Sequence, residues 1–160
     1  MTSFIGANLT KTYTAAELQT EGSAPGVGDR YVDSNGNEYR FVKYNSGAGA
    51  VAAAVGNFCY LYAASGTSAG AYNEVTSDLS DSANIGAGVL QAVIANGSYG
   101  WIQTRGVATL TPSLTAGADG NALTAAGATD GTLDVSAAVT DFICAVAVDA
   151  SAKIVMLTCP

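Results

Sequence analysis

Few residues of this 160-residue sequence could carry out chemistry, and their types limit which reactions are open. The chain contains no histidine, which excludes a Ser-His-Asp triad, a Cys-His pair and a histidine metal site. Its three cysteines, Cys59, Cys144 and Cys159, lack the spacing of a metal site, so we expect them to pack as small hydrophobic residues. A reactive thiol at Cys159 is the alternative.

The thirteen acidic residues are the other candidates for chemistry. Carboxylate catalysis needs two acids held near each other, but these acids are scattered singly among small residues. Each is therefore expected to be a solvated surface charge. We predict no enzyme activity, no catalytic residue, no metal site and no cofactor. An enzyme with an unusual carboxylate site stays as an alternative.

Two short motifs imitate ligand-binding loops. Residues 47–52 match the dinucleotide pattern G-x-G-x-x-A, but Gly56 would end any following helix within two turns, so we predict a loop of small residues instead. Residues 33–38 resemble the start of a calcium loop. However, Glu38 replaces the required glycine and Tyr44 replaces the bidentate glutamate, so a hairpin turn is favoured.

Charge and length restrict the partners and the class of protein. The formal net charge is −7 with only six Lys and Arg residues, too few to neutralise a run of phosphates, so nucleic acid and membrane are not expected as partners. No segment approaches the ~20 continuous apolar residues of a membrane helix. The start of the chain lacks the charged and apolar regions of a signal peptide, so we expect the protein to be made and kept in a cytoplasm, or to leave it by another route.

The hydrophobic pattern predicts an all-β fold, a small β-barrel or β-sandwich, with at most one short helix near the N-terminus. That helix would begin at the capping-box sequence of residues 14–17. Strands are expected in the β-branched and aromatic runs at residues 30–33, 38–44, 58–62, 142–148 and 153–157, and as two or three strands in close succession within 88–110. Asn-Gly turns are expected at 35–36 and 96–97, and an Arg-Gly turn at 105–106. Residues 1–13 would form an extended N-terminal arm and residues 14–160 a single β domain.

Two features predict how the strands are covered. The last two strands, 142–148 and 153–157, are apolar at successive positions, so both faces should be covered, by a second sheet layer or by another subunit. Tyr99, Trp101 and Arg105 alternate along one strand and should face the same way. They could belong to the core or to a subunit interface, where such residues are enriched, and the pattern leaves both open.

Three segments together resemble the head decoration, or cement, proteins of tailed bacteriophages. They are Gly-Ser-Tyr-Gly-Trp-Ile-Gln-Thr-Arg-Gly at 97–106, Leu-Thr at 123–124 within glycine-rich loops, and Thr-Asp-Phe-Ile-Cys-Ala-Val-Ala-Val at 140–148. The resemblance covers residues 85–157. It implies a compact β domain, commonly a homotrimer, on the outer surface of the virion capsid, where it braces neighbouring copies of the major capsid protein. It implies no enzyme, no cofactor and no nucleic-acid contact, and synthesis in the host cytoplasm.

The resemblance leads to one hypothesis about capsid binding, and a different function is kept as the alternative. The N-terminal arm, with Phe4, Ile5, Leu9 and Tyr13, would grip the capsid, because an extended segment can add main-chain hydrogen bonds to the edge of a neighbouring sheet. The alternative function is an accessory module of a phage tail or fibre that binds a host surface receptor or glycan.

Overall fold

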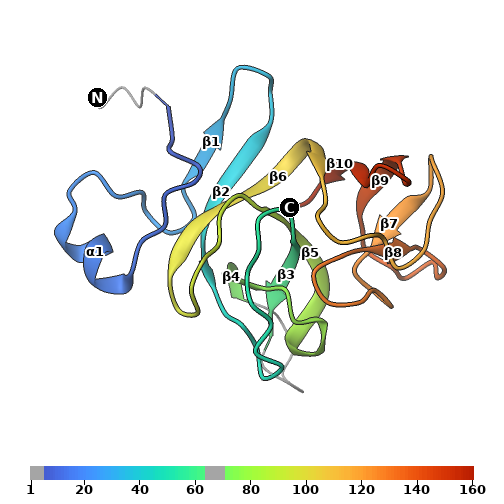
Figure 1. Ribbon diagram of the computed structural model, residues 1–160, viewed down its shortest axis with the longest axis horizontal. Coiled ribbons are helices and arrows are strands. Elements are labelled where there is room, and N and C mark those ends of the chain that lie inside the picture. The colour runs from blue at the N-terminus through green and yellow to red at the C-terminus, as the bar shows by residue number, and fades with distance from the viewer. Residues whose placement is uncertain (1–5, 64–70) are drawn as a thin grey trace.

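The computed structural model describes residues 6–63 and 71–160 (Figure 1). Within these residues the chain forms one short α-helix, one short 3-10 helix and ten strands, so the predicted all-β fold is confirmed. The helices are α1 (Ala15–Thr20) and η1 (Leu79–Asp81). The strands are β1 (Arg30–Val32), β2 (Glu38–Tyr44), β3 (Phe58–Tyr62), β4 (Ala71–Thr76), β5 (Ser82–Leu90), β6 (Tyr99–Thr109), β7 (Ala122–Thr124), β8 (Asp134–Val135), β9 (Ile143–Asp149) and β10 (Ile154–Thr158).

Five of these strands close a ring. Strand β2 pairs with β4 in parallel and with β6 in antiparallel orientation, while β3 lies between β4 and β5, and β5 pairs with β6. Closing a sheet in this way removes its open edges and creates an enclosed interior. Fully buried side chains fill that interior: Val42, Tyr44, Cys59, Val75, Leu90, Ile94 and Ile102.

Strand β6 is longer than the ring requires and continues into a second sheet. Its first half pairs with β2 and β5, and its residues 105–109 pair with β10, which is followed in order by β9, β7 and β8. Figure 1 shows β7 to β10 at one end of the molecule, beside the ring. We call these four strands, with the end of β6, the outer sheet. A Cβ at Gly86 of β5 would lie 2.6 Å from Cys144 Sγ of β9, so a glycine allows the outer sheet to pack closely on the ring.

This continuation corrects one expected turn. Arg105 and Gly106 do not reverse the chain, and of the two or three strands expected within 88–110 the structure has two, the end of β5 and all of β6. Gly106 has φ +95°, a backbone conformation that only glycine adopts without strain. The glycine therefore permits an irregularity within a strand, where the sequence pattern suggested a turn.

The local predictions near the N-terminus are confirmed. Thr14 and Glu17 form the capping box of α1, in which the Thr14 amide donates to Glu17 Oε2 at 2.6 Å. Strands β1 and β2 form an antiparallel hairpin whose turn contains Gly36 with φ +82°. The Asp33 carboxylate accepts the amides of Asn35 and Asn37 at 2.8 and 3.0 Å. These acidic and amide groups therefore build the turn, as the hairpin interpretation requires.

Aromatic side chains form a separate cluster on the outside of the ring, where β2 and β6 pair. The Trp101 ring centroid lies 5.3 Å from that of Phe41 and 6.4 Å from that of Tyr31. The N-terminal segment covers this cluster, because Tyr13 and Tyr99 exchange backbone hydrogen bonds of 2.9 and 2.8 Å and the Tyr13 ring packs on Phe41. The cluster fastens residues before α1 to the ring.

The described chain itself covers the outer sheet on one face only, so the expected cover of the second face by another subunit stays a prediction. Buried and exposed side chains alternate along β10 and, from Ala145 onward, along β9. One set, including Ala145, Ala147, Val155 and Leu157, packs in a core shared with the ring. The second sheet layer accounts for that face, and within the described residues the opposite face has no such layer.

Replacing Trp101 by alanine tests the contribution of the aromatic cluster. The side chain is 2% exposed and contacts rings from β1 and β2, so the free energy of unfolding should fall by about 3–5 kcal/mol. Urea denaturation followed by circular dichroism measures this change. The exposed Val93 is the control, and Val93→Ala should change stability by less than about 0.5 kcal/mol. Equal effects of the two substitutions would contradict the assignment of Trp101 to the core.

Candidate interaction surface

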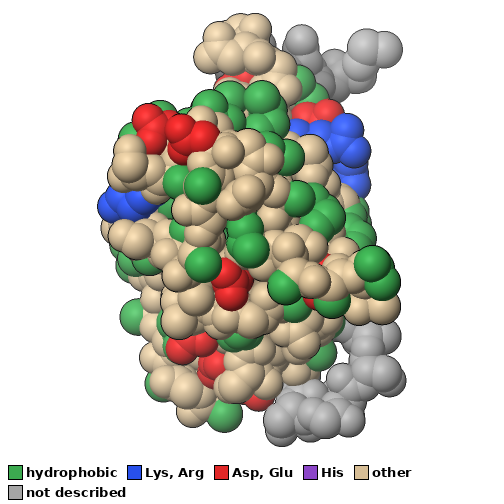
Figure 2. Space-filling model, turned by 90° about the vertical axis from the view of Figure 1, so that its right-hand side faces the viewer, with side chains coloured by type: hydrophobic (Ala, Val, Ile, Leu, Met, Phe, Trp, Pro, Cys, Tyr) green, Lys and Arg blue, Asp and Glu red, His purple; other side chains and the backbone are tan. Residues whose placement is uncertain are grey.

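Exposed hydrophobic side chains gather at the outer sheet. Of twelve large hydrophobic residues that are exposed in the described chain, seven lie in the end of β6, in β9 and β10, or just before β9. They are Val107, Val139, Phe142, Ile143, Val146, Val148 and Met156. Figure 2 looks at this end of the molecule, where hydrophobic side chains are spread among polar surface with several Asp and Glu groups, while Lys and Arg appear only at the margins.

Three of these residues form a straight row across the sheet, which we call the outer row. Val107 of β6 is the direct partner of Met156 of β10, and Met156 is the direct partner of Val146 of β9. Their side chains are 51%, 43% and 37% exposed. Direct partners point to the same face, and neighbouring strands lie about 4.8 Å apart, so the row extends about 10 Å. Ala122 of β7 continues it as the partner of Val146.

The outer row itself carries no charge. The outward residues beside the row on β6 and β10 are Thr109 and Thr158, with Arg105 at one end. Arg105 lies 3.8 Å from Glu38 across the neighbouring strand pair, which places the nearest ion pair at the rim. An apolar centre with a polar rim is the usual composition of a protein–protein interface. The arrangement can therefore bind another protein surface, and its side chains offer no reacting group.

The structure separates the three residues predicted to be core or interface. Trp101 lies inside the aromatic cluster and is covered by its own chain. Tyr99 is half-buried and stacks on Phe41 with ring centroids 6.4 Å apart. Arg105 is exposed and lies on β6, two residues before Val107 of the outer row. Sequence reasoning did not single out Val107, Val146 or Met156, because residues 154–157 are apolar at successive positions and show no alternation that would mark an open face.

The proposed arm residues have different surroundings. Tyr13 is buried in the aromatic cluster, and Leu9 is partly buried against the same cluster. Their side chains thus contact their own chain first. Phe4 and Ile5 lie outside the described residues.

The cysteines pack as small hydrophobic residues, as predicted. All three are buried and none forms a disulfide. Burial raises the pKa of the Cys59 thiol to about 12. A hydrogen bond with Cys144, together with burial, raises the pKa of Cys159 well above its ordinary value. Because a thiol needs to lose its proton to react, both the burial and the raised pKa of Cys159 disfavour the alternative of a reactive thiol there.

The dinucleotide-like segment forms a loop after β2 and no helix, as predicted. The amides of Ala48 and Gly49 donate to the carboxylates of Asp81 and Asp78 at 2.6 and 2.7 Å. Two of the amides that would cradle a phosphate are therefore already occupied by the chain's own acids.

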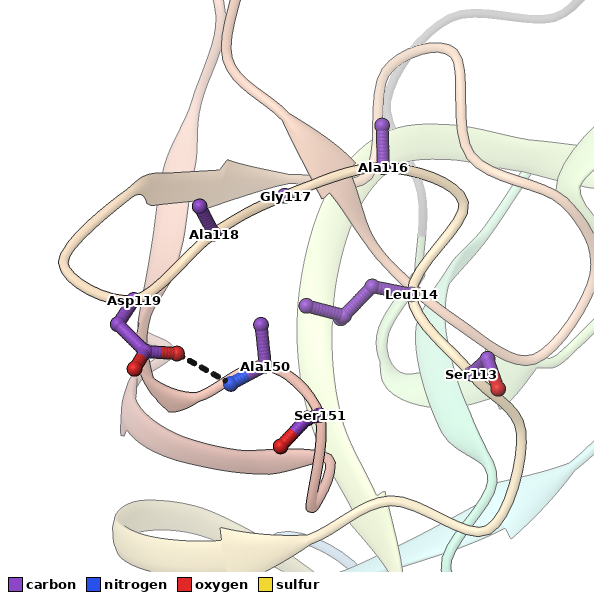
Figure 3. A pocket seen from close by; sticks show the side chains of 8 residues that line it. All are labelled: Ser113, Leu114, Ala116, Gly117, Ala118, Asp119, Ala150 and Ser151. Carbon is purple, nitrogen blue, oxygen red and sulfur yellow. Dashed lines mark hydrogen bonds between the residues drawn. The ribbon is translucent and has the colours of Figure 1, made fainter.

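A shallow pocket of about 630 Å³ lies between the loop of residues 113–119 and the turn joining β9 to β10 (Figure 3). Its one carboxylate belongs to Asp119, whose Oδ1 accepts the Ala150 amide at 2.8 Å. Ser113 and Ser151 supply hydroxyl groups, and Leu114 supplies apolar surface. These residues contain no pair of nucleophile and base. In residues 6–63 and 71–160 no group of three or more acids or cysteines is placed to hold a metal ion.

The chain matches no family model, no curated protein and no solved structure. Its longest α-helix in the described part has six residues, and no helix there has the length and hydropathy needed to cross a membrane.

Placing a lysine in the outer row tests whether this face is free. Met156→Lys should change the free energy of unfolding by less than about 1 kcal/mol, because the side chain reaches solvent. Its neighbour Leu157 points into the core and is 2% exposed, so Leu157→Lys should destabilise strongly, by about 3 kcal/mol or more. Chemical denaturation of both variants measures the difference. Comparable losses would show that the outer row is covered in the folded chain.

Proposed function

We propose that this protein is a bacteriophage capsid decoration protein, which binds the outside of the assembled head and braces neighbouring major capsid subunits. The outer row is the observation that carries the proposal, because it gives the fold an uncharged, apolar face able to dock on another protein. The resemblance of residues 97–106 and 140–148 to head decoration proteins supports it independently. Residues 143–148 of the second segment belong to β9, which carries part of the row.

The mechanism is stabilisation by mass action. A protein that binds the assembled shell, but not its dissociated subunits, lowers the free energy of the shell in proportion to the occupied sites. Burying apolar surface contributes about 25 cal/mol per Å², so a row of three half-exposed side chains supplies only a modest affinity at each contact. Many such contacts over a shell add up to a large total.

We propose that the protein acts as a homotrimer after synthesis in the host cytoplasm. Three copies on one symmetric site would bind with an effective concentration far above that of free monomers, so no single contact has to be strong. The outer row and the arm residues Phe4, Ile5 and Leu9 would share the contacts with the capsid and between subunits. The proposal includes no enzymatic step, no nucleic acid and no membrane.

Co-sedimentation with capsids tests this function. Wild-type protein mixed with expanded shells of its phage should sediment with them and saturate at a fixed number of copies per shell. Met156→Lys and Val146→Lys should lower the affinity about tenfold or more, because a charge enters a desolvated apolar contact. Val93→Lys adds the same charge at an exposed valine outside the outer sheet and should bind as wild type does.

Absence of any shell binding would contradict the decoration proposal. Binding to host cell envelopes or glycans instead would support the accessory module of a tail or fibre. If both lysine variants bound shells as tightly as wild type, the decoration function would stand, but the outer row would not be part of the contact with the capsid.

Truncation tests the arm separately. Removing residues 1–8 should weaken capsid binding, because Phe4 and Ile5 are lost, while Leu9 and Tyr13 stay on the aromatic cluster. The free energy of unfolding should change by less than about 1 kcal/mol. Sedimentation measures the binding, and denaturation measures the stability. Unchanged capsid occupancy would contradict a role of the arm in gripping the shell.

A further inference from the structure

Two buried carboxylates hold the loop that follows β2. The Ala48 amide donates to Asp81 Oδ2 at 2.6 Å, and the Gly49 amide donates to Asp78 Oδ2 at 2.7 Å. Asp78 is the N-cap of η1 and Asp81 its last residue, and they are 2% and 5% exposed. A short turn before β5 thus fixes a loop that lies about thirty residues earlier in the sequence.

The conformation of this loop depends on its acceptors. Gly47 and Ala50 have φ +70° and +52°, and the left-handed backbone is unfavourable for alanine. The amides of Ser46 and Gly47 donate to Asn96 Oδ1 and Asn45 Oδ1, both at 3.0 Å. Four consecutive amides therefore donate to side-chain oxygens. A concave run of amides favours negative charge, and the two carboxylates supply it.

Acids rather than bases surround the turn. Asp78 and Asp81 share η1, and Asp130 accepts the Leu79 amide at 2.9 Å. Among the described residues, neither Asp78 nor Asp81 forms an ion pair with Lys or Arg. The loop itself has no ionisable side chain between residues 46 and 50. Amide and hydroxyl donors therefore compensate these buried charges.

The strands packed against the loop contribute three further titratable groups. The Tyr44 hydroxyl of β2 donates to the Val51 carbonyl at 2.8 Å. Lys43 and Glu74 form an ion pair of 3.1 Å between β2 and β4, and Glu74 also accepts a hydrogen bond from Asn45 at 3.2 Å. Lys43 is thus engaged by Glu74.

Protonation of Asp78 opposes the folded arrangement. Burial alone would raise the pKa of Asp78, but hydrogen bonds from Ser80 and Gly49 hold it below the ordinary value of 3.8. Since the folded pKa lies below the unfolded one, the stabilisation is complete above the unfolded pKa. It is lost as the pH falls through the folded pKa.

We propose that Asp78 and Asp81 form an acid-sensitive latch, and that protonation of Asp78 frees the loop of residues 46–50 and opens the cavity that this loop walls. The cavity has a volume of about 260 Å³, and its lining includes Tyr44, Ser46, Ala50, Ala53, Val93 and Ile94. Ser46 and Ala50 belong to the loop, whereas Ile94 is buried at the end of the ring. Movement of the loop therefore exposes the interior of the barrel. This inference is independent of the proposed function.

An NMR titration of the wild-type protein tests the latch. The amide protons of Ala48 and Gly49 should shift together as Asp78 titrates. Over the same pH range the loop should lose at least about tenfold in hydrogen-exchange protection, after correction for intrinsic rates. A soluble paramagnetic probe should then broaden the Ile94 methyl signals. Constant protection of the loop through the titration of Asp78 would overturn the proposal.

Two variants separate the latch from general acid unfolding. Asp78→Asn removes the charge at nearly constant size and should lower loop protection about tenfold or more at neutral pH, and abolish the acid step. The control is Asp141→Asn, which removes a carboxylate that accepts the amides of Ala137 and Ala138 in another turn. It should leave the loop of residues 46–50 unchanged. Equal loop protection in Asp78→Asn and wild type would also overturn the proposal.

Discussion

The structure depends on one strand that belongs to two sheets. The first half of β6 closes the ring with β2 and β5, and residues 105–109 carry the outer sheet through β10. In the strand order, β10 lies between β6 and β9. The outer strands β9, β7 and β8 are therefore joined to the ring through the pairing of β10 with β6. Gly106 allows this double role, because its positive φ lets the strand depart from regular geometry without ending. The candidate interaction surface exists because β6 does not turn at residue 105.

This constraint also explains why one part of β6 is buried and another part is exposed. Trp101 lies where the ring, β1 and the N-terminal segment cover the strand, so it is an anchor of the core. Val107, six positions later, lies where only the outer sheet continues, and it stays exposed. The pairing of β6 with β10 and of β10 with β9 aligns Val107 with Met156 and Val146, so a shift by one residue would turn this row into the core.

Local signals in the sequence predicted local structure well. The capping box at Thr14, the Asn35-Gly36 hairpin and the strand at residues 58–62 each depend on a few adjacent residues. Closure of the ring depends instead on the parallel pairing of β2 with β4 and on the return of β6 to β2, which join residues far apart in the sequence. The outer row escaped prediction for the same reason. Continuous apolar residues indicate burial on both faces, whereas only long-range pairing decides how many layers are present.

The acidic composition of the chain is accommodated largely at its turns. With six basic residues against thirteen acids, most carboxylates have no cation to pair with. Several bind backbone amides of turns instead: hydrogen bonds from Asn37, Ala138 and Ala152 lower the pKa of Asp33, Asp141 and Asp149, respectively. Negative charge is thereby concentrated at turns and loop ends. Asp141 lies just before β9 and Asp149 ends it, so negative charge also borders the outer sheet that carries the row.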